Sequence, residues 1–285
     1  MSASRTVYLN GEFVPLDQAR VPVMDRGFLF ADGIYEVSAV LDGKLVDNAA
    51  HLARLDRSLG EIGIANPHDA AAWERLQADL VARNGLVEGL VYMQVTRGVM
   101  ERDFGFPPAG TPTTVVMFTQ AKKIVANPLA ESGARVITVE DLRWKRRDIK
   151  SVALLAQVLA KQQAVEAGVA EAWMVEDGAV TEGSSSTAFI VTRDRTLITR
   201  PLSTALLPGI TRASVLRLAG EADLRVEERL FTVAEALEAQ EAFYTSASSF
   251  VMPVVEIDGT RLGDGVPGPL SRRLRALYLE VARGA

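Results

Sequence analysis

Three short phrases in the second half of the chain hold residue types that can do chemistry. They are Asp148–Ser151 around Lys150, Thr181–Ser186 around Glu182, and Leu207–Arg212. A lysine supplies an amine that can attack a carbonyl carbon and form a Schiff base. Glu182 supplies a carboxylate, and the third phrase is typical of a helix start, whose first backbone N–H groups can bind an anion. Together the phrases offer a nucleophile, an acid and an anion-binding turn.

Lys150 differs from most lysines in having apolar sequence around it. Ile149 precedes it, and the apolar stretch 152–159 follows. A lysine pressed against apolar surface loses hydration, which favours its neutral, nucleophilic form. Most lysines are solvated surface groups, however, and spacing alone does not separate Lys150 from Lys145 or Lys161. The choice of Lys150 therefore depends on the order of the three phrases.

The other two phrases also have an ordinary interpretation. Glu182 and the serines at 184–186 are typical of a turn, and Gly209-Ile210-Thr211 is typical of a helix start capped by threonine. In the chemical interpretation the carboxylate holds a pyridine nitrogen, the serine hydroxyls donate hydrogen bonds around a cofactor, and the helix start takes a phosphate. This order of groups predicts a site for pyridoxal 5'-phosphate. Arg54 lies off the apolar stripe of its helix, so we expect it to be exposed or to reach that phosphate.

Composition and charge narrow the classes of function. A net charge of −5 over 285 residues argues against nucleic acid as the main partner, because a phosphate backbone needs a basic surface. The chain has no cysteine, and its two histidines, His51 and His68, are too few for a zinc site; we expect both on helix surfaces. The first eight residues lack the apolar core of a signal peptide, and no apolar run approaches bilayer length. We expect a soluble, cytoplasmic protein without a metal.

Hydrophobic periodicity predicts strands and two helices in the first 119 residues of the chain. The strands are expected at residues 6–9, 35–41, 44–46, 90–97 and 113–119. Asp42-Gly43 predicts a hairpin turn. Asn48 is the expected N-cap of a helix with a stripe of leucines, and a second helix at residues 70–82 should stop near Asn84-Gly85.

The strand at residues 90–97 alternates clearly. Val91, Met93 and Val95 should face one side of the sheet, and Tyr92, Gln94 and Thr96 the other. The second face carries a row of hydrogen-bonding groups. It is either the wall of a pocket or a solvated sheet face.

The pattern lapses around residues 120–132, which indicates a domain boundary. Beyond it, strands are expected at residues 135–140, 171–176, 187–192, 196–199 and 242–245, and helices at 152–167, 211–222, 233–240 and 270–282. This alternation predicts an α/β (α+β) fold. We expect a small N-terminal α/β domain at residues 1–120, a linker at 121–130 and a larger C-terminal cofactor-binding domain at 131–285.

These phrases and several others, taken in order, resemble the class-IV (fold type IV) pyridoxal-phosphate aminotransferases, and most closely the D-amino-acid transaminases. The similarity covers almost the whole chain. It includes Asp25–Gly27, Asp32–Val37, His51–Leu55, Gln94–Gly98, Arg143-Trp144, Asp148–Ser151, Leu159–Gln162, Thr181–Ser186, Gly209–Arg212 and Val255–Gly259. So many matches in sequence order are specific to one family.

The resemblance implies a role for each matching residue. Lys150 would form the Schiff base and later move the proton, and Glu182 would pair with the pyridine nitrogen. The phosphate would be surrounded by Arg54, Ile210, Thr211, Ser246 and Ala247, with Leu207 packed on the ring, while Tyr35, Tyr92 and Arg102 would bind the substrate. Arg102 would reach over from the second subunit of a homodimer. The family fold is a two-domain architecture that holds the cofactor at the domain junction.

Three positions depart from the family pattern. D-amino-acid transaminases typically have a histidine two residues after the Arg102 position, where both help bind the substrate carboxylate; here it is Phe104. The class pattern also expects asparagine at Thr187, and threonine is common at Ala247. The change at Phe104 leaves the substrate range open.

The resemblance implies transfer of an amino group from a D-amino acid to a 2-oxo acid such as 2-oxoglutarate, by a ping-pong mechanism. Two alternatives share the same scaffold: a branched-chain L-amino-acid aminotransferase and an (R)-amine transaminase. Two further alternatives are an aminodeoxychorismate lyase and a non-catalytic pyridoxal-phosphate-binding protein. Arg102 favours the D-amino-acid interpretation, because it would supply a carboxylate trap.

Overall fold

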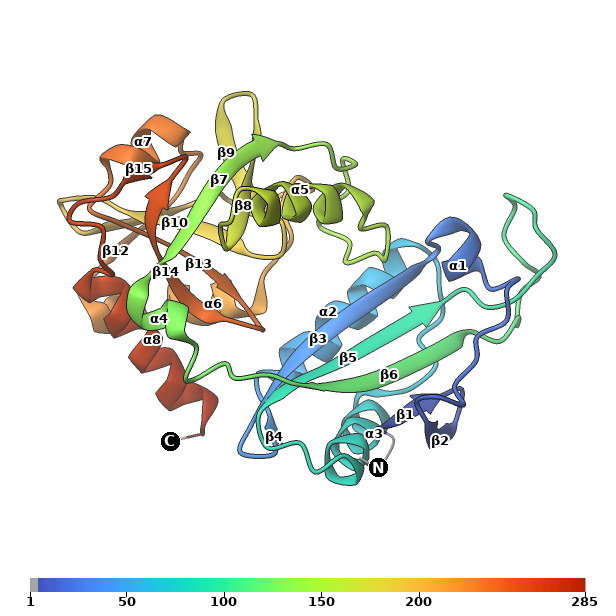
Figure 1. Ribbon diagram of the computed structural model, residues 1–285. Coiled ribbons are helices and arrows are strands. Elements are labelled where there is room, and N and C mark those ends of the chain that lie inside the picture. Colours follow the sequence, from blue (N-terminus) through green and yellow to red (C-terminus); the bar gives the residue numbers. More distant parts are fainter. Residues whose placement is uncertain (1–4, 285) are drawn as a thin grey trace. The chain divides into compact units, whose positions relative to one another are not determined.

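The computed structural model describes residues 5–284, which form two compact units (Figure 1). The first unit contains residues 5–123 and the short segment Ile149–Ala153; the second contains residues 124–148 and 154–284. The segment with Lys150 thus groups with the N-terminal unit, although the chain on both sides of it belongs to the second unit. The domain boundaries expected at residues 120 and 131 stay a prediction.

The first unit is built on a six-stranded antiparallel sheet in the order β2-β1-β6-β5-β3-β4. Its strands are β1 (Thr6–Leu9), β2 (Glu12–Pro15), β3 (Gly33–Leu41), β4 (Lys44–Leu45), β5 (Gly89–Thr96) and β6 (Thr114–Ala121). The predicted hairpin is confirmed, since Asp42 and Gly43 both have positive φ between β3 and β4.

Two of this unit's three helices, those at residues 48–61 and 70–83, pack on one face of the sheet. The three helices are α1 (Arg26–Phe30), α2 (Asn48–Glu61) and α3 (Ala70–Arg83). The leucine stripe of α2 packs into a core with Trp73 and Leu80 of α3 and with the buried side chains of β5. The N-cap prediction is wrong by one residue: Asp47 is the N-cap, and Asn48 instead bonds Ser38 and Gln77 through its side-chain amide.

The second unit contains a nine-stranded mixed sheet. Eight strands follow the order β12-β11-β10-β13-β14-β7-β8-β9, and β15 pairs with β14. They are β7 (Ala134–Glu140), β8 (Glu171–Glu176), β9 (Ala179–Gly183), β10 (Thr187–Val191), β11 (Thr196–Thr199), β12 (Arg225–Glu228), β13 (Glu241–Ser246), β14 (Phe250–Ile257) and β15 (Thr260–Arg261). Glu182 therefore lies inside β9 rather than in the turn that its neighbours suggested.

The helices of the second unit pack on this sheet. They are α4 (Pro128–Ser132), α5 (Leu155–Glu166), α6 (Ile210–Leu218) with a following 3-10 turn (Ala219–Ala222), α7 (Val233–Glu238) and α8 (Pro269–Ala282). Alanines of α5 bury against β8, whereas α6 packs against β13 and α8. The mixed α and β content predicted from the sequence is confirmed. No helix within residues 5–284 is long and apolar enough to cross a membrane.

Candidate active site

Lys150 lies at the edge of the first unit's sheet, beside strand β3. Its carbonyl oxygen accepts from Tyr35 N at 3.0 Å, and Ser151 forms a bridge with Ile34. The Lys150 Nζ atom lies 4.2 Å from the centre of the Tyr35 ring. Its backbone N–H donates to Ser58 Oγ on α2 at 3.4 Å. The main chain therefore holds the lysine in place, and its half-buried amine rests against an aromatic face.

Tyr35 and Tyr92 form an aromatic wall on the sheet face away from α2 and α3. Their ring centres are 5.7 Å apart, and Tyr92 also stacks on Phe118. The Tyr92 hydroxyl donates to Gln94 Oε1 at 2.8 Å. Both tyrosines are half-buried. Thr96 is buried, and its hydroxyl donates to Asp25.

Arg54 is buried, not exposed, because a buried carboxylate holds it. Its Nε donates to Glu36 Oε1 at 2.6 Å and its Nη2 to Glu36 Oε2 at 2.9 Å. Burial acts to raise the pKa of Glu36, but Arg54 and His51 hold that pKa well below its usual range. The helix-surface prediction for His51 is therefore wrong, since it is 3% exposed and bonds Glu36. His68 lies in the loop before α3, not on a helix.

Arg102 and Phe104 lie in the loop between β5 and β6. Arg26 supports this loop by donating from Nη1 to the carbonyl oxygens of Asp103 at 2.7 Å and Gly105 at 3.0 Å. The Arg102 guanidinium lies 5.2 Å from the Phe30 ring and 5.5 Å from the Phe104 ring. Phe104 is 78% exposed. The loop thus presents a cation beside an uncovered aromatic ring where the resemblance expects an imidazole.

Glu182 is the central acid of the second unit. Its carboxylate is buried, and it accepts from Arg143 Nη1 and from the backbone N–H of Leu207 at 3.4 Å. Burial raises the pKa of the Glu182 carboxyl, and Arg143 opposes that rise. Burial acts to lower the pKa of Arg143, but its bonds to Asp141 and Glu182 raise that pKa above its usual range. The structure thus joins two predicted residues, Glu182 and Leu207, through one carboxylate.

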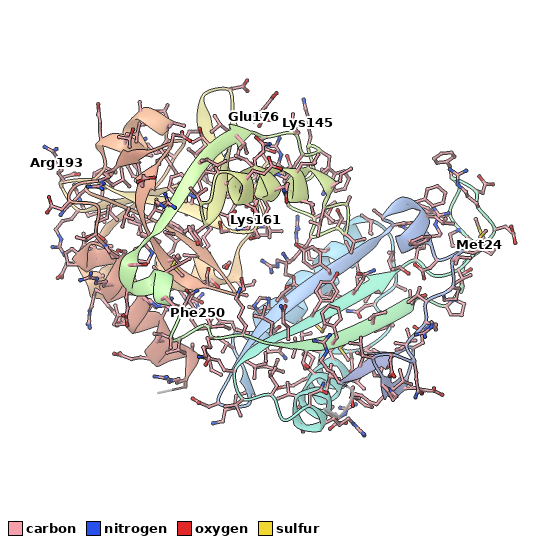
Figure 2. The ribbon with its side chains drawn as sticks, viewed as in Figure 1. Met24, Lys145, Lys161, Glu176, Arg193 and Phe250 are labelled. Carbon is pink, nitrogen blue, oxygen red and sulfur yellow. The ribbon has the colours of Figure 1, made fainter. Side chains whose placement is uncertain are left out.

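A chain of ion pairs continues from Arg143 away from Glu182. Asp141 accepts from Arg143 Nη2 at 2.7 Å and from the Thr181 hydroxyl at 2.6 Å. Arg147 Nη1 lies 3.3 Å from Asp141, and its guanidinium bonds both carboxylate oxygens of Glu176 (labelled in Figure 2). The sequence alone does not predict this network. Arg143-Trp144 stands among the family phrases, but nothing in its spacing indicates which acid it contacts.

The second-unit residues that the resemblance expects around a phosphate lie at a helix start and at a turn after a strand. Helix α6 begins at Ile210 after the N-cap Gly209, and no side-chain hydrogen bond caps it. The predicted helix start is confirmed, but threonine capping is wrong, because Thr211 lies within the helix. Ser246 ends β13, against which α6 packs. Its hydroxyl contacts Ser249 Oγ at 2.7 Å and Ser248 Oγ at 3.3 Å, around Ala247.

The serines that follow Glu182 bond another buried acid. The hydroxyls of Ser184, Ser185 and Ser186 all donate to the carboxylate of Glu171 on β8. The expectation that these serine hydroxyls donate hydrogen bonds to a cofactor is therefore wrong, because they donate to Glu171 instead. A serine hydroxyl has one proton to donate, and Glu171 already accepts it.

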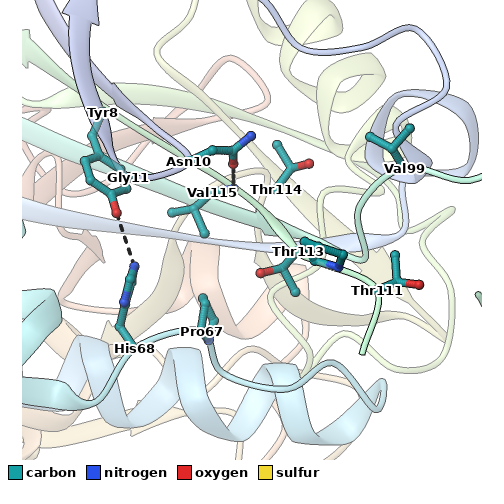
Figure 3. Close-up of a pocket in the computed structure, with 11 residues that line it drawn as sticks. Tyr8, Asn10, Gly11, Pro67, His68, Val99, Thr111, Thr113, Thr114 and Val115 are labelled. Carbon is teal, nitrogen blue, oxygen red and sulfur yellow. Dashed lines mark hydrogen bonds between the residues drawn. The ribbon is translucent and has the colours of Figure 1, made fainter. Parts of the chain in front are cut away.

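A separate hollow of about 420 Å³ lies on the first unit (Figure 3). Its lining includes the Tyr8 hydroxyl, which contacts His68 Nε2 at 3.3 Å. The other lining residues are Asn10, Gly11, Pro67, Val99, Thr111, Pro112, Thr113, Thr114 and Val115. The structure describes every site residue predicted from the sequence, and none of them lines this hollow.

Fold and site together define a family. A family model described as amino-transferase class IV matches residues 33–257 of the chain. The chain belongs to the class-IV aminotransferases, and it is an enzyme of the transferase class. The family predicted from the sequence is confirmed.

Curated relatives are similar along nearly the whole chain. A D-alanine aminotransferase of Staphylococcus aureus (strain N315) is 39% identical over 269 residues, which cover 94% of this chain and 95% of the relative. One of Bacillus licheniformis is also 39% identical, covering 94% of each chain.

Solved structures of this type are similar in fold. A branched-chain amino acid aminotransferase of T.th., solved with pyridoxamine 5'-phosphate, has a TM-score of 0.90 and 27% identity, covering 99% of this chain and 95% of its own. That of Thermoproteus uzoniensis, with norvaline, has a TM-score of 0.86 and 27% identity over the same shares. The fold type IV prediction is confirmed.

Proposed function

We propose that this protein is a pyridoxal-phosphate-dependent aminotransferase that moves the amino group of a D-amino acid to a 2-oxo acid by a ping-pong mechanism. The observation that carries the proposal is the buried Glu182 carboxylate, held between Arg143 and the N–H of Leu207. The named activity of the D-alanine aminotransferase relatives supports the choice of substrate class.

The residues of the second unit fit the cofactor. Burial raises the pKa of the Glu182 carboxyl, so its charged form is stabilised by a partner that carries a proton and a positive charge. A protonated pyridine nitrogen is such a partner. The start of α6 has no side-chain cap, and backbone N–H groups at such a position bind phosphate. In the proposal Glu182 pairs with the ring nitrogen and Leu207 packs on the ring. Ile210, Thr211, Ser246 and Ala247 bind the phosphate.

The first unit supplies the reacting amine and the substrate wall in this proposal. Lys150 Nζ joins the cofactor, later takes the α-proton of the amino acid and returns it, first as a base and then as an acid. Arg54, oriented by Glu36, contacts the phosphate. Tyr35 and Tyr92 line the substrate pocket. The cofactor, when bound, supplies an aldehyde that accepts amino groups and a ring that withdraws electrons from the carbon losing its proton.

The assignment of Lys150 is tested by substitution and by chemical labelling. Lys150→Ala should abolish steady turnover, because both the covalent attachment and the proton transfer need its amine. Borohydride reduction of the holoenzyme, followed by peptide mapping, should place the label on Lys150. The exposed Lys145 is the control, and Lys145→Ala should keep full activity. A label elsewhere, or substantial turnover in Lys150→Ala, would contradict the proposal.

Phe104 supports a second candidate function, that of an (R)-amine transaminase. The resemblance expects a histidine at this position, and an exposed phenylalanine cannot donate a hydrogen bond to a carboxylate. This favours the (R)-amine transaminase alternative. Half-reactions with D-alanine, L-leucine and (R)-phenylethylamine, followed by cofactor absorbance, distinguish the three classes. D-alanine should react fastest, and a faster reaction with either other donor would replace the D-amino-acid proposal.

The proposal also includes a homodimer in the cytoplasm. The resemblance that places Arg102 at a second subunit's site supports the dimer, and the composition of the chain supports the location. Sedimentation of the purified holoenzyme measures whether it is a dimer.

A further inference from the structure

The second unit contains a buried acid that the proposed chemistry does not use. Glu171, the first residue of β8, is 2% exposed. A buried carboxylate must be compensated by hydrogen bonds or opposite charge, because it has lost its hydration. The groups around Glu171 therefore indicate why the molecule keeps an acid there.

The donors to Glu171 come mainly from one turn. Ser184 donates its hydroxyl proton to Oε1, while Ser185 and Ser186 donate theirs to Oε2 at 3.4 and 3.0 Å. The backbone N–H of Ala172 adds a bond to Oε1 at 2.9 Å. Lys161 of α5 (labelled in Figure 2) lies 4.0 Å from Oε1, and its ammonium donates to the Ala170 carbonyl. Most of the compensation thus comes from three consecutive hydroxyls.

That turn follows Glu182 directly, and it is tightly built. Gly183 N donates to the Ser186 carbonyl at 2.7 Å, and Ser184 N donates to the Ala172 carbonyl at 2.9 Å. A Cβ atom on Gly183 would lie 2.1 Å from Ser186 Oγ and 3.3 Å from the carboxyl carbon of Glu171. Movement of the serines would therefore be transmitted to Gly183 and so to the Glu182 backbone.

We propose that Glu171 is a positioning residue, which fixes the Ser184–Ser186 turn and thereby the direction of the Glu182 carboxylate. It also sets the polarity of the turn, because hydroxyls that donate to Glu171 present only lone pairs to their other neighbours. The inference rests on the proposed function, in which Glu182 meets the ring nitrogen of the cofactor.

The test compares Glu171→Gln with a matched control, Glu241→Gln. Glu241 is also buried in the second unit, at 4% exposure, and accepts from Leu270 N, Ser271 N and the Ser271 hydroxyl at the start of α8. Both substitutions remove a buried charge that receives hydroxyl donors, so both should lower thermal stability. Only the Glu171 variant should change the surroundings of Glu182.

Two measurements distinguish a positioning role of Glu171 from a contribution to stability alone. In cofactor-free protein, hydrogen exchange should speed up at residues 181–187 in Glu171→Gln but not in Glu241→Gln. In holoenzyme, the pH profile of the cofactor absorbance should shift only in Glu171→Gln, and kcat should fall about tenfold or more with little change in KM. Ser186→Ala, which removes one donor and keeps the acid, should move both readouts in the same direction by less.

The outcomes also separate this inference from the proposed function. The wild-type protein is first shown to bind pyridoxal phosphate and to be labelled at Lys150 by borohydride; failure there overturns the proposed function. If the wild type passes, identical absorbance profiles and kcat in the wild type and Glu171→Gln overturn the role of Glu171. Equal effects of Glu171→Gln and Glu241→Gln also overturn it, because they would indicate lost stability alone.

Discussion

Arg54 and Glu182 of the candidate site are each oriented by an oppositely charged partner. Glu36 accepts two bonds from Arg54, and Arg143 bridges Glu182 and Asp141. A buried ion pair adds little net stability, but removal of one partner leaves an uncompensated charge. The main effect of these buried pairs is therefore to orient the side chains of Arg54 and Glu182. Substitution of either partner in a pair should destabilise the protein.

The role of Glu182 can be separated from cofactor retention. Glu182→Gln should leave the cofactor bound but slow the single-turnover half-reaction by about 10²- to 10³-fold, because preorganised charge near the ring is lost. Rapid-mixing absorbance measures that rate. Glu176→Gln, at the partly exposed far end of the same network, is the control and should react at the wild-type rate. An unchanged rate in Glu182→Gln would argue against its contact with the ring nitrogen.

Glu36 should contribute stability that depends on pH. Its pKa is lower in the folded protein than the value of 4.5 of an ordinary glutamate, so acid protonates the unfolded chain first. Its contribution is thus present above about pH 4.5 and is lost as the pH falls toward the folded pKa. Glu36→Gln should lower the unfolding free energy at neutral pH by about 3 kcal/mol.

Urea unfolding at neutral and acidic pH measures both effects. Below about pH 4.5 the variant should lose stability less steeply than the wild type, by up to about 1.4 kcal/mol per pH unit. Glu61→Gln, at the partly exposed end of α2, is the control and should keep the wild-type slope. Parallel curves for the wild type and Glu36→Gln would refute this account of Glu36.

Helices and strands with clear periodicity were predictable from the sequence, and those set by tertiary contacts were not. The stripe Leu52, Leu55 and Leu59 predicts α2 correctly because one apolar face is its main signal. Helices α1 and α4 have only five residues each, too short for such a pattern. Strand β14 was missed because Pro253 interrupts it, and proline is uncommon inside strands.

In the candidate site, too, some residues could be proposed from the sequence, whereas the residues that contact them could not. Lys150, Glu182 and the helix start at Gly209 could be singled out from residue type and order, and their roles stay predictions. Glu36, which bonds Arg54, Arg143, which bonds Glu182, and Glu171, which bonds the serines at 184–186, could not be singled out, because each contact joins residues far apart in the chain. Glu36 and Arg54 are 18 residues apart, and Arg143 and Glu182 are 39 apart. A single sequence contains no signal that pairs them.

The close packing around Gly209 at the start of α6 allows the role of this helix to be tested. A Cβ atom on Gly209 would lie 2.9 Å from Thr187 Oγ1 and 3.2 Å from Arg212 Cβ, so either the Thr187 side chain or the helix start would have to shift. Gly209→Ala should therefore weaken cofactor affinity by about tenfold, measured by absorbance titration of cofactor-free protein. Gly220→Ala, where nothing lies within 4 Å, is the control. Equal affinities in the two variants would show that the helix start does not bind the phosphate.

For the whole molecule, the proposed dimer can be tested by subunit mixing. If Arg102 acts at the partner's site, Lys150→Ala and Arg102→Ala homodimers each lack a complete site. Mixed dimers would combine an intact Lys150 in one subunit with an intact Arg102 from the other.

Random exchange between the two variants should therefore restore about a quarter of the sites. The measurement is turnover after mild unfolding and refolding of the mixture, with each variant treated alone as the control. No recovery, with dimers present by sedimentation, would mean that Arg102 serves its own subunit or none.

The chain passes from one compact unit to the other three times, and this limits how the molecule can be divided. The five residues Ile149–Ala153 belong with the N-terminal unit, and Ile149 is part of its core. A fragment ending at residue 123 would thus lack both a core side chain and the amine of Lys150. A chimaera with a single crossover at residue 123 would take Lys150 and β3 from different parents, so recombination between homologues at that boundary must exchange this pentapeptide together with the N-terminal unit.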